Sequence, residues 1–351
     1  MAGTGTAHMR SRDAALLRAD ALTVEFPVSR SLKVHAVSGI SLDVLEGETL
    51  GLVGESGCGK STTGRAMMQL PRPTSGAVLF DGVDLTTLNN RALRKMRPQL
   101  QLIFQDPISS LNPRRTVAEI VGEPLKIWGR GTAAEQSAKV DEVLEAVGLD
   151  PETSRPKRPH QFSGGQCQRI CIARALVLEP KVIICDEPVS ALDVSVQAQI
   201  LNLLEDMKAR YGLTLVFIAH DLAVVKNVSD RVVVMYLGKL CEVASPDDLY
   251  TRPAHPYTAA LLSAIPVPDP SATARIPTAL AGELPSPMAP PSGCRFRTRC
   301  PRADERCAEE EPQMRAVQGS SNHFVACHFP LIEAAETAAP PTAVPVDVNG
   351  T

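Results

Sequence analysis

The sequence Gly54-Glu-Ser-Gly-Cys-Gly-Lys-Ser61 is the strongest indication of the type of fold. It matches the pattern G-x-x-x-x-G-K-[ST], whose glycines let backbone N–H groups point at phosphate oxygens. We expect Lys60 to bring a positive charge to the β- and γ-phosphates and Ser61 to offer its hydroxyl to Mg²⁺. The apolar run 49–53 predicts a strand before this turn, and 61–70 predicts a helix whose positive end faces the phosphates. The residues predicted to contact the ligand are Gly54, Glu55, Ser56, Gly57, Cys58, Gly59, Lys60, Ser61 and Thr62.

Two further apolar runs, 181–185 and 213–219, are typical of strands buried on both faces. Asp186 and Glu187 follow the first run, and His220 follows the second. Ligands of open parallel sheets bind beyond the carboxyl ends of the strands, where these polar groups are expected. We expect Asp186 to hold Mg²⁺ and Glu187 to position or deprotonate an attacking water. A solvated acidic loop is the alternative for this pair.

The composition is that of a globular protein near neutrality. The chain has 351 residues, 44% of them hydrophobic, with 36 Lys and Arg against 39 Asp and Glu and a net charge of -3. Binding nucleic acid through bulk charge needs a clustered positive excess, so we expect no nucleic-acid partner. The apolar runs are shorter than the roughly 20 residues that cross a bilayer. Residues 1–19 lack the apolar core of a secretory signal, which favours the cytoplasm.

The order of the predicted elements indicates the fold class. Short β-rich runs alternate with helical patterns from about Asp20 to Leu262, which predicts an α/β protein with a largely parallel sheet. Prolines crowd residues 266–291 and predict an extended linker, because proline removes backbone donors. Residues 334–351 are rich in Ala, Pro and Thr and are predicted to be disordered.

Four more motifs follow the glycine-rich turn in a characteristic order. Phe162-Ser-Gly-Gly-Gln166 resembles the signature segment of ABC-type ATPases. In the same way Gln105 resembles the Q-loop glutamine, Ser190-Ala-Leu-Asp193 the D-loop and His220 the switch histidine. Gln105 or His220 alone would more often be an ordinary loop residue, but the complete ordered set resembles this family.

The resemblance implies a P-loop NTPase of the ABC type. Its fold would be α/β, with a largely parallel core sheet, an antiparallel β subdomain, a helical subdomain and a small Cys-rich C-terminal extension. ATP and Mg²⁺ would be the cofactors, with Mg²⁺ held by Ser61, Gln105 and Asp186. Glu187, His220 and Gln105 would be the catalytic residues.

The resemblance also implies that two nucleotide domains pair head to tail. Ser163 and Gly165 of one chain would then meet the γ-phosphate held by Lys60 of another. Phe26 is the candidate for stacking on adenine, with ordinary core packing as the alternative. The further nucleotide contacts implied in this way are Ser163, Gly164, Gly165, Gln166 and Asp193.

The C-terminal third is similar to the extension of oligopeptide and dipeptide importer ATPases. The similarity rests on 255–258, 282–287 and 293–301. It implies a paralogous ATPase partner more than a homodimer, two membrane permeases, an external solute-binding protein, and a place on the cytoplasmic face of the inner membrane. The implied division is a flexible tail over 1–19, an ATPase domain over 20–262 with its helical subdomain at about 106–175, the importer-type extension over 263–333, and a disordered tail over 334–351.

Four cysteines crowd into the extension: Cys294, Cys300, Cys307 and Cys327. A proline-rich segment with few apolar residues usually needs a staple, and disulfides are disfavoured in the cytosol. Four thiolates suit a [4Fe-4S] cluster, which some ATPases with this extension bind; zinc and simple packing are the alternatives.

Two other function classes compete with the importer ATPase. A soluble ABC ATPase acting on ribosomes or DNA would usually have a second phosphate loop or a long coiled coil, and this sequence has neither. A regulatory module that binds ATP without hydrolysis would usually lack Glu187 or His220. Which peptide or other cargo is imported is chosen by other subunits, so the sequence does not identify it.

Overall fold

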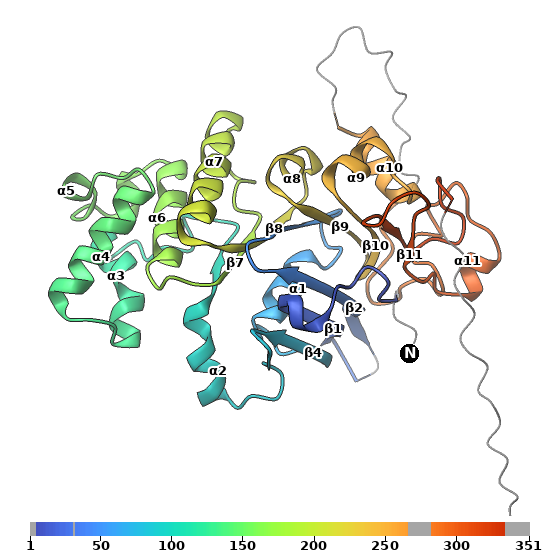
Figure 1. Cartoon of the computed structure of the whole chain (residues 1–351), viewed down its shortest axis with the longest axis horizontal. Coiled ribbons are helices and arrows are strands. Elements are labelled where there is room, and N and C mark those ends of the chain that lie inside the picture. Colours follow the sequence, from blue (N-terminus) through green and yellow to red (C-terminus); the bar gives the residue numbers. More distant parts are fainter. Residues whose placement is uncertain (1–4, 31, 266–281, 334–351) are drawn as a thin grey trace, which may run out of the picture.

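The structure is a computed structural model that describes residues 5–30, 32–265 and 282–333 (Figure 1). The predicted disordered tail and most of the predicted linker lie outside these residues. The strands are β1 Ala15–Pro27, β2 Lys33–Leu45, β3 Thr49–Val53, β4 Ser75–Phe80, β5 Val83–Asp84, β6 Leu100–Ile103, β7 Val182–Asp186, β8 Thr214–Ala219, β9 Arg231–Tyr236, β10 Lys239–Ala244, β11 Arg315–Ala316 and β12 Phe324–Val325. The α-helices are α1 Lys60–Met67, α2 Asn90–Met96, α3 Val117–Trp128, α4 Ala133–Ala146, α5 Pro151–Ser154, α6 Gly164–Leu176, α7 Val194–Tyr211, α8 Leu222–Val228, α9 Pro246–Thr251, α10 Pro256–Ser263 and α11 Arg306–Glu309.

In the described ranges these strands form two sheets. The larger has the order β11-β12-β10-β9-β3-β8-β7-β6, and the smaller, antiparallel sheet has the order β2-β1-β4-β5. From β9 to β6 the neighbours in the larger sheet are parallel, whereas β10, β11 and β12 continue it antiparallel. This arrangement confirms the predicted α/β fold with a parallel core sheet and a separate antiparallel sheet.

The central strands are apolar throughout because each of their faces meets a different core. Val182 and Ile184 of β7 pack in the cluster shared with the smaller sheet. Ile183 and Cys185 pack in the cluster shared with the helices on the other face. Alternation of side chains along a strand therefore gives no polar face, and the continuous apolar runs of the sequence are explained. Strand β3 has the predicted bounds, and β7 and β8 each begin one residue later than predicted.

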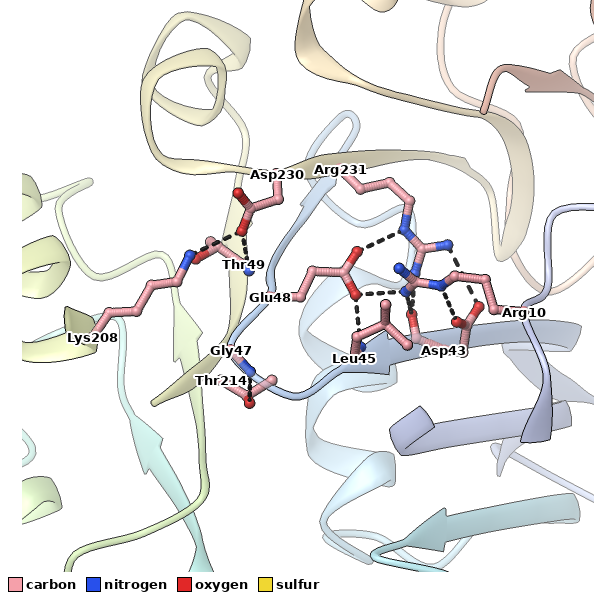
Figure 2. A network of polar contacts seen from close by, with 10 residues as sticks. All are labelled: Arg10, Asp43, Leu45, Gly47, Glu48, Thr49, Lys208, Thr214, Asp230 and Arg231. Carbon is pink, nitrogen blue, oxygen red and sulfur yellow. Dashed lines mark hydrogen bonds and ion pairs between the residues drawn. The ribbon is translucent and has the colours of Figure 1, made fainter. Parts of the chain in front are cut away.

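Ordered structure begins earlier than the predicted flexible tail allows, because buried charges bind the N-terminal segment (Figure 2). Arg10 Nε lies 2.6 Å from a carboxylate oxygen of Asp43, which is fully buried, and Arg10 also pairs with Glu48. Arg231 Nε donates to Glu48 at 2.9 Å, so the same carboxylates bind β9. Charges removed from water need such partners. The network joins the N-terminal segment, β2 and β9 around the turn that leads into β3.

Helices α3, α4 and α6 pack against one another at one end of the molecule, and α11 and β11 lie at the other (Figure 1). Each of the three helices begins with a capping box, in which the first side chain and the residue three positions on bond each other's backbone N–H. Within the described ranges, no helix combines the length and apolar character that crossing a membrane requires.

A buried carboxylate joins the C-terminal extension to the core sheet. Glu242 on β10 is fully buried and accepts hydrogen bonds from the backbone N–H groups of Ala254 and His255, at 2.7 and 2.9 Å. The Nε2 atom of His323, in the segment between β11 and β12, lies 2.6 Å from the same side chain. Strand β12 pairs with β10 beside this contact. The extension is therefore held by both strand pairing and a buried polar contact.

The buried His255 predicts a pH dependence of stability. Burial lowers the pKa of His255 to about 4, whereas an exposed histidine titrates near about 6.5. The unfolded chain binds the extra proton as pH falls from 6.5 towards 4, so this contribution to stability is present above that window and is lost within it. His255→Asn keeps a capping oxygen for the N–H of Tyr257 but does not titrate. Between pH 7 and pH 4 the free energy of unfolding should fall about 3 kcal/mol further in the unaltered chain than in this variant. Parallel denaturation profiles of the two proteins would contradict the assignment.

Candidate nucleotide site

The glycine-rich turn between β3 and α1 is packed against two neighbouring strands. Gly54 and Gly59 have φ angles of 149° and 105°. A Cβ atom on Gly54 would lie 2.1 Å from the carbonyl oxygen of Met235 on β9. One on Gly59 would lie 2.3 Å from the carbonyl oxygen of Ala36 on β2. Both positions therefore require glycine, and the spacing of the motif follows from this close packing.

Lys60 is enclosed by the turn that precedes it. Its side chain is almost completely buried, and Nζ donates to the carbonyl oxygens of Gly54 and Glu55 at 2.8 and 3.0 Å. Among the described residues no carboxylate forms an ion pair with this ammonium. A buried cation with only carbonyl partners is incompletely compensated, so the site favours an anionic ligand.

A cavity of about 560 Å³ opens beside Lys60. It brings together residues from the glycine-rich turn, from β1 and β2, and from the loops after β6, β7 and β8. This is the location that the strand ends predict for a ligand. The residues that line it are Phe26, Val34, Ala36, Ser56, Gly57, Gly59, Lys60, Ser61, Thr62, Gln105, Glu187, His220 and Pro287.

The last residue of β7, Asp186, is held by two residues of α1. The hydroxyl of Ser61 donates to Oδ1 at 2.6 Å, and Arg65 Nη2 lies 2.9 Å from Oδ2. Ser61 and Arg65 are four positions apart, which places both side chains on one face of the helix. A hydroxyl and a carboxylate in contact at a phosphate-binding turn are the oxygen ligands that Mg²⁺ prefers.

Side chains from the loops after β6 and β8 both contact Glu187. Gln105 Nε2 donates to its Oε2 atom at 3.0 Å, and His220 Nδ1 lies 3.3 Å from the same oxygen. The Glu187 side chain is 13% exposed, against 54% for His220. Its φ of 49° is in the left-handed region, an uncommon conformation for a non-glycine residue that is often found at functional sites. The structure thus brings together the three residues predicted to be catalytic.

The predicted signature residues lie elsewhere, at the start of α6. The hydroxyl of Ser163 accepts from Gln166 N, while Gln166 Oε1 accepts from Ser163 N, so the two residues cap the helix. A Cβ on Gly165 would lie 2.5 Å from Val196 of α7, which begins immediately after Asp193. Of the described residues that line the cavity, none belongs to 163–166. Phosphate loop and signature segment therefore lie apart within one chain.

Comparisons with known proteins agree with this geometry. Residues 37–190 match the family described as ABC transporter, and residues 241–307 match the one described as oligopeptide/dipeptide transporter, C-terminal region. The oligopeptide transport ATP-binding protein OppF of Salmonella typhimurium is 53% identical over 296 residues, which cover 84% of this chain and 87% of that protein. The putative oligopeptide transport ATP-binding protein YkfD of Bacillus subtilis is 52% identical, covering 90% and 95%. The chain belongs to the ABC transporter family.

Solved structures of ABC proteins share the fold. A dimeric ATP-binding cassette, MJ0796, in a post-hydrolysis state with ADP and Pi, is 30% identical with a TM-score of 0.60, covering 66% of this chain and 98% of that one. CbiO1 from Clostridium perfringens, part of the ABC transporter complex cbiONQ, is also 30% identical with a TM-score of 0.61, covering 68% and 92%. The predicted family is confirmed. The chain is an ATPase subunit of a membrane transporter that uses ATP with Mg²⁺.

Some residues that the sequence predicts to contact the ligand do not line the cavity, and other residues take part that were not predicted. Gly54, Glu55 and Cys58 belong to the turn but do not line the cavity. Cys58 is fully buried, which raises the pKa of its thiol to about 11. Arg65 was not predicted, although its spacing from Ser61 on one helix was a signal for it. Pro287 of the extension lines the cavity as well, and nothing in its sequence surroundings indicates this.

The four cysteines of the extension do not form a metal site in this structure. All nine cysteines lie in the described ranges as free thiols. Burial, with a smaller contribution from the other thiols of the extension, raises the pKa values of Cys294 and Cys327 to about 11 and about 12. Among the described residues, no group of three or more His, Cys, Asp or Glu side chains has an arrangement that fits a metal ion. The predicted iron–sulfur cluster and its zinc alternative are therefore unsupported by this geometry.

The packing of the turn predicts different effects for two glycine substitutions. Gly59→Ala should lower the free energy of unfolding by at least about 2 kcal/mol, because the new methyl group meets the carbonyl oxygen of Ala36. Gly57 has a φ of 79°, and a methyl group added to it would meet nothing within 4 Å, so Gly57→Ala should lower it by about 1 kcal/mol through backbone strain alone. Denaturant unfolding of both variants measures the difference. Equal losses would contradict the close approach of β2.

Proposed function

We propose that this ABC subunit powers the import of short peptides by hydrolysing ATP between two nucleotide domains paired head to tail. The observation that supports it most strongly is the convergence of Gln105 and His220 on one oxygen of Glu187, beside the cavity that Lys60 and Ser61 line. Glu187 would act as general base on the attacking water. Gln105 and His220 would orient that carboxylate, and His220 would contact the γ-phosphate.

The residues around Ser61 fit a magnesium ion. Ser61 and Asp186 are in contact at 2.6 Å, and Gln105 lines the same cavity with an amide oxygen to offer. All are hard oxygen donors, as Mg²⁺ requires. When bound, the ion neutralises charge on the phosphates. Arg65 would keep Asp186 oriented through its ion pair.

A second chain would complete the site. Ser163 and Gly165 lie at the start of α6 outside the cavity, and this separation supports a head-to-tail dimer in which they approach the phosphates of the opposite domain. Asp193 caps no backbone group with its side chain and lies next to Val194, which is 83% exposed. We propose a paralogous ATPase as that partner, with a homodimer as the alternative.

The membrane partners are proposed from the relatives and from one exposed surface. Relatives such as OppF are named for oligopeptide transport, which supports short peptides as the cargo. Phe104 and Ile108 flank Gln105 and are 42% and 64% exposed. Movement at Gln105 during the ATP cycle would be passed to a permease helix docked on these residues. Two permeases and an external solute-binding protein would complete an importer that holds this chain at the cytoplasmic face of the inner membrane.

Two substitutions separate hydrolysis from nucleotide binding. Glu187→Gln should keep ATP binding but lower turnover at least about a hundredfold, because it removes the general base and leaves Ser61 and Asp186 in place. Lys60→Ala should weaken binding itself, because the phosphates lose their buried cation. Turnover of the assembled complex and binding of a fluorescent ATP analogue measure the two effects. Near-normal hydrolysis by the Glu187→Gln protein would refute the role of this carboxylate.

The metal content of the extension is a separate proposal. Burial raises the pKa of Cys327, and the neighbouring thiols of Cys294, Cys300 and Cys307 contribute to the rise, which supports a shared thiol environment. Four cysteines in one short extension suit an iron–sulfur cluster. Binding would require the thiols to turn from the arrangement described above. Anaerobically purified protein should contain about four irons per chain and absorb near about 400 nm, and Cys300→Ser should abolish both. One zinc per chain would favour the alternative; metal-free protein with a protease-resistant extension would contradict both.

A further inference from the structure

The glycine-rich turn is bound from outside the ATPase fold by the C-terminal extension. Glu55 does not line the nucleotide cavity. Instead, its two carboxylate oxygens accept hydrogen bonds from the guanidinium of Arg299, Oε2 from Nη1 at 2.7 Å and Oε1 from Nη2 at 3.1 Å. A bidentate contact of this kind fixes the orientation of the carboxylate and also neutralises its charge. Arg299 lies 244 residues further along the chain.

Aromatic rings hold Arg299 in this position. Its side chain is 6% exposed, and its guanidinium carbon lies 5.9 Å from the centre of the Tyr236 ring. The Tyr236 ring in turn contacts Tyr257 and Phe296 at centroid distances of 4.8 and 5.2 Å. Phe296 belongs to the extension, and all three rings are buried. The arginine therefore has a packed environment that limits its motion.

The backbone of Glu55 also forms a hydrogen bond with Lys60. Its carbonyl oxygen accepts from Lys60 Nζ at 3.0 Å, and its N–H donates to the Tyr257 hydroxyl at 2.9 Å. Arg299 fixes the side chain, Tyr257 the amide and Lys60 the carbonyl of one residue. A contact made by the extension thus reaches the phosphate-binding cation through a single residue.

The ion pair between Glu55 and Arg299 also affects the electrostatics of the ligand site. Glu55 brings a negative charge to a turn whose ligand is a triphosphate. An unpaired carboxylate there would repel the ligand, and the repulsion is only weakly screened beside a buried site. The guanidinium of Arg299 neutralises this charge and holds it away from the cavity.

We propose that Arg299 is a positioning residue of the nucleotide site, through which the C-terminal extension sets the affinity of the glycine-rich turn for ATP. The inference rests on the proposed nucleotide site at Lys60. If the unaltered chain failed to bind ATP, that site would be refuted. If the unaltered chain binds and the variants below do not differ from it, only the role of Arg299 is refuted.

A double-mutant cycle on the full chain tests the proposal. Arg299→Gln should raise the Kd for a fluorescent ATP analogue about tenfold, the effect of losing a charge-assisted contact. Glu55→Gln should change the Kd less, because it removes the repelling charge together with the contact. In the double variant, Arg299→Gln should add little to Glu55→Gln, because its partner carboxylate is already absent. Arg299→Lys should restore part of the affinity.

The matched control is Arg297→Gln, since Arg297 donates to Ser292 within the extension at 3.0 Å. This variant should bind the analogue as the unaltered chain does. Unchanged affinity in Arg299→Gln, or effects of Arg299→Gln and Glu55→Gln that simply add, would overturn the proposal. If Arg299→Gln does not fold, Arg299→Lys and Glu55→Gln decide: an affinity for ATP unaltered in both would overturn it equally.

Discussion

The rest of the site depends on a buried ammonium group that lacks a carboxylate partner among the described residues. Lys60 is 4% exposed and bonded to two carbonyl oxygens. Such a cation is stable only where the surrounding backbone is fixed. The fixed backbone comes from Gly54 and Gly59, which pack against the carbonyls of β9 and β2 without room for a side chain. An anionic ligand balances the remaining positive charge of Lys60. The buried ammonium group therefore explains both why positions 54 and 59 must be glycine and why the site has affinity for phosphate.

The sheet order places the chemistry around this cation. Strand β3 lies between β8 and β9, with β7 next to β8. Asp186, Glu187 and His220 therefore leave neighbouring strand ends beside the turn. The signature segment lies on a different element, α6, which packs with α3 and α4. In the proposed head-to-tail pair, this separation would make activity depend on a second domain, and a transporter could use that dependence to link hydrolysis to the movement of its membrane subunits.

Sequence reasoning located the parts that local pattern determines. The strand before the glycine-rich turn, the apolar runs of β7 and β8, and the residues at their ends follow from short stretches of sequence. It did not identify contacts between distant segments. Arg10 orders residues that were expected to be flexible, and Arg299 binds Glu55 across 244 positions. Neither residue differs in its local sequence from an ordinary surface arginine, so the ion pairs that make each one important appear only in the folded chain. The spacing of the four cysteines predicts a metal site, whereas among the described residues their side chains are not arranged to hold an ion.

The most direct test of the account is peptide transport itself. The complex captured through this chain is reconstituted into lipid vesicles so that its ATPase subunits face the solution, with its solute-binding protein and a labelled short peptide enclosed. ATP added outside should move peptide out of the vesicle lumen, and the complex that contains Glu187→Gln should bind ATP but move none. The account would be contradicted if the unaltered complex hydrolysed ATP without moving any peptide, or if the Glu187→Gln complex transported it at the normal rate.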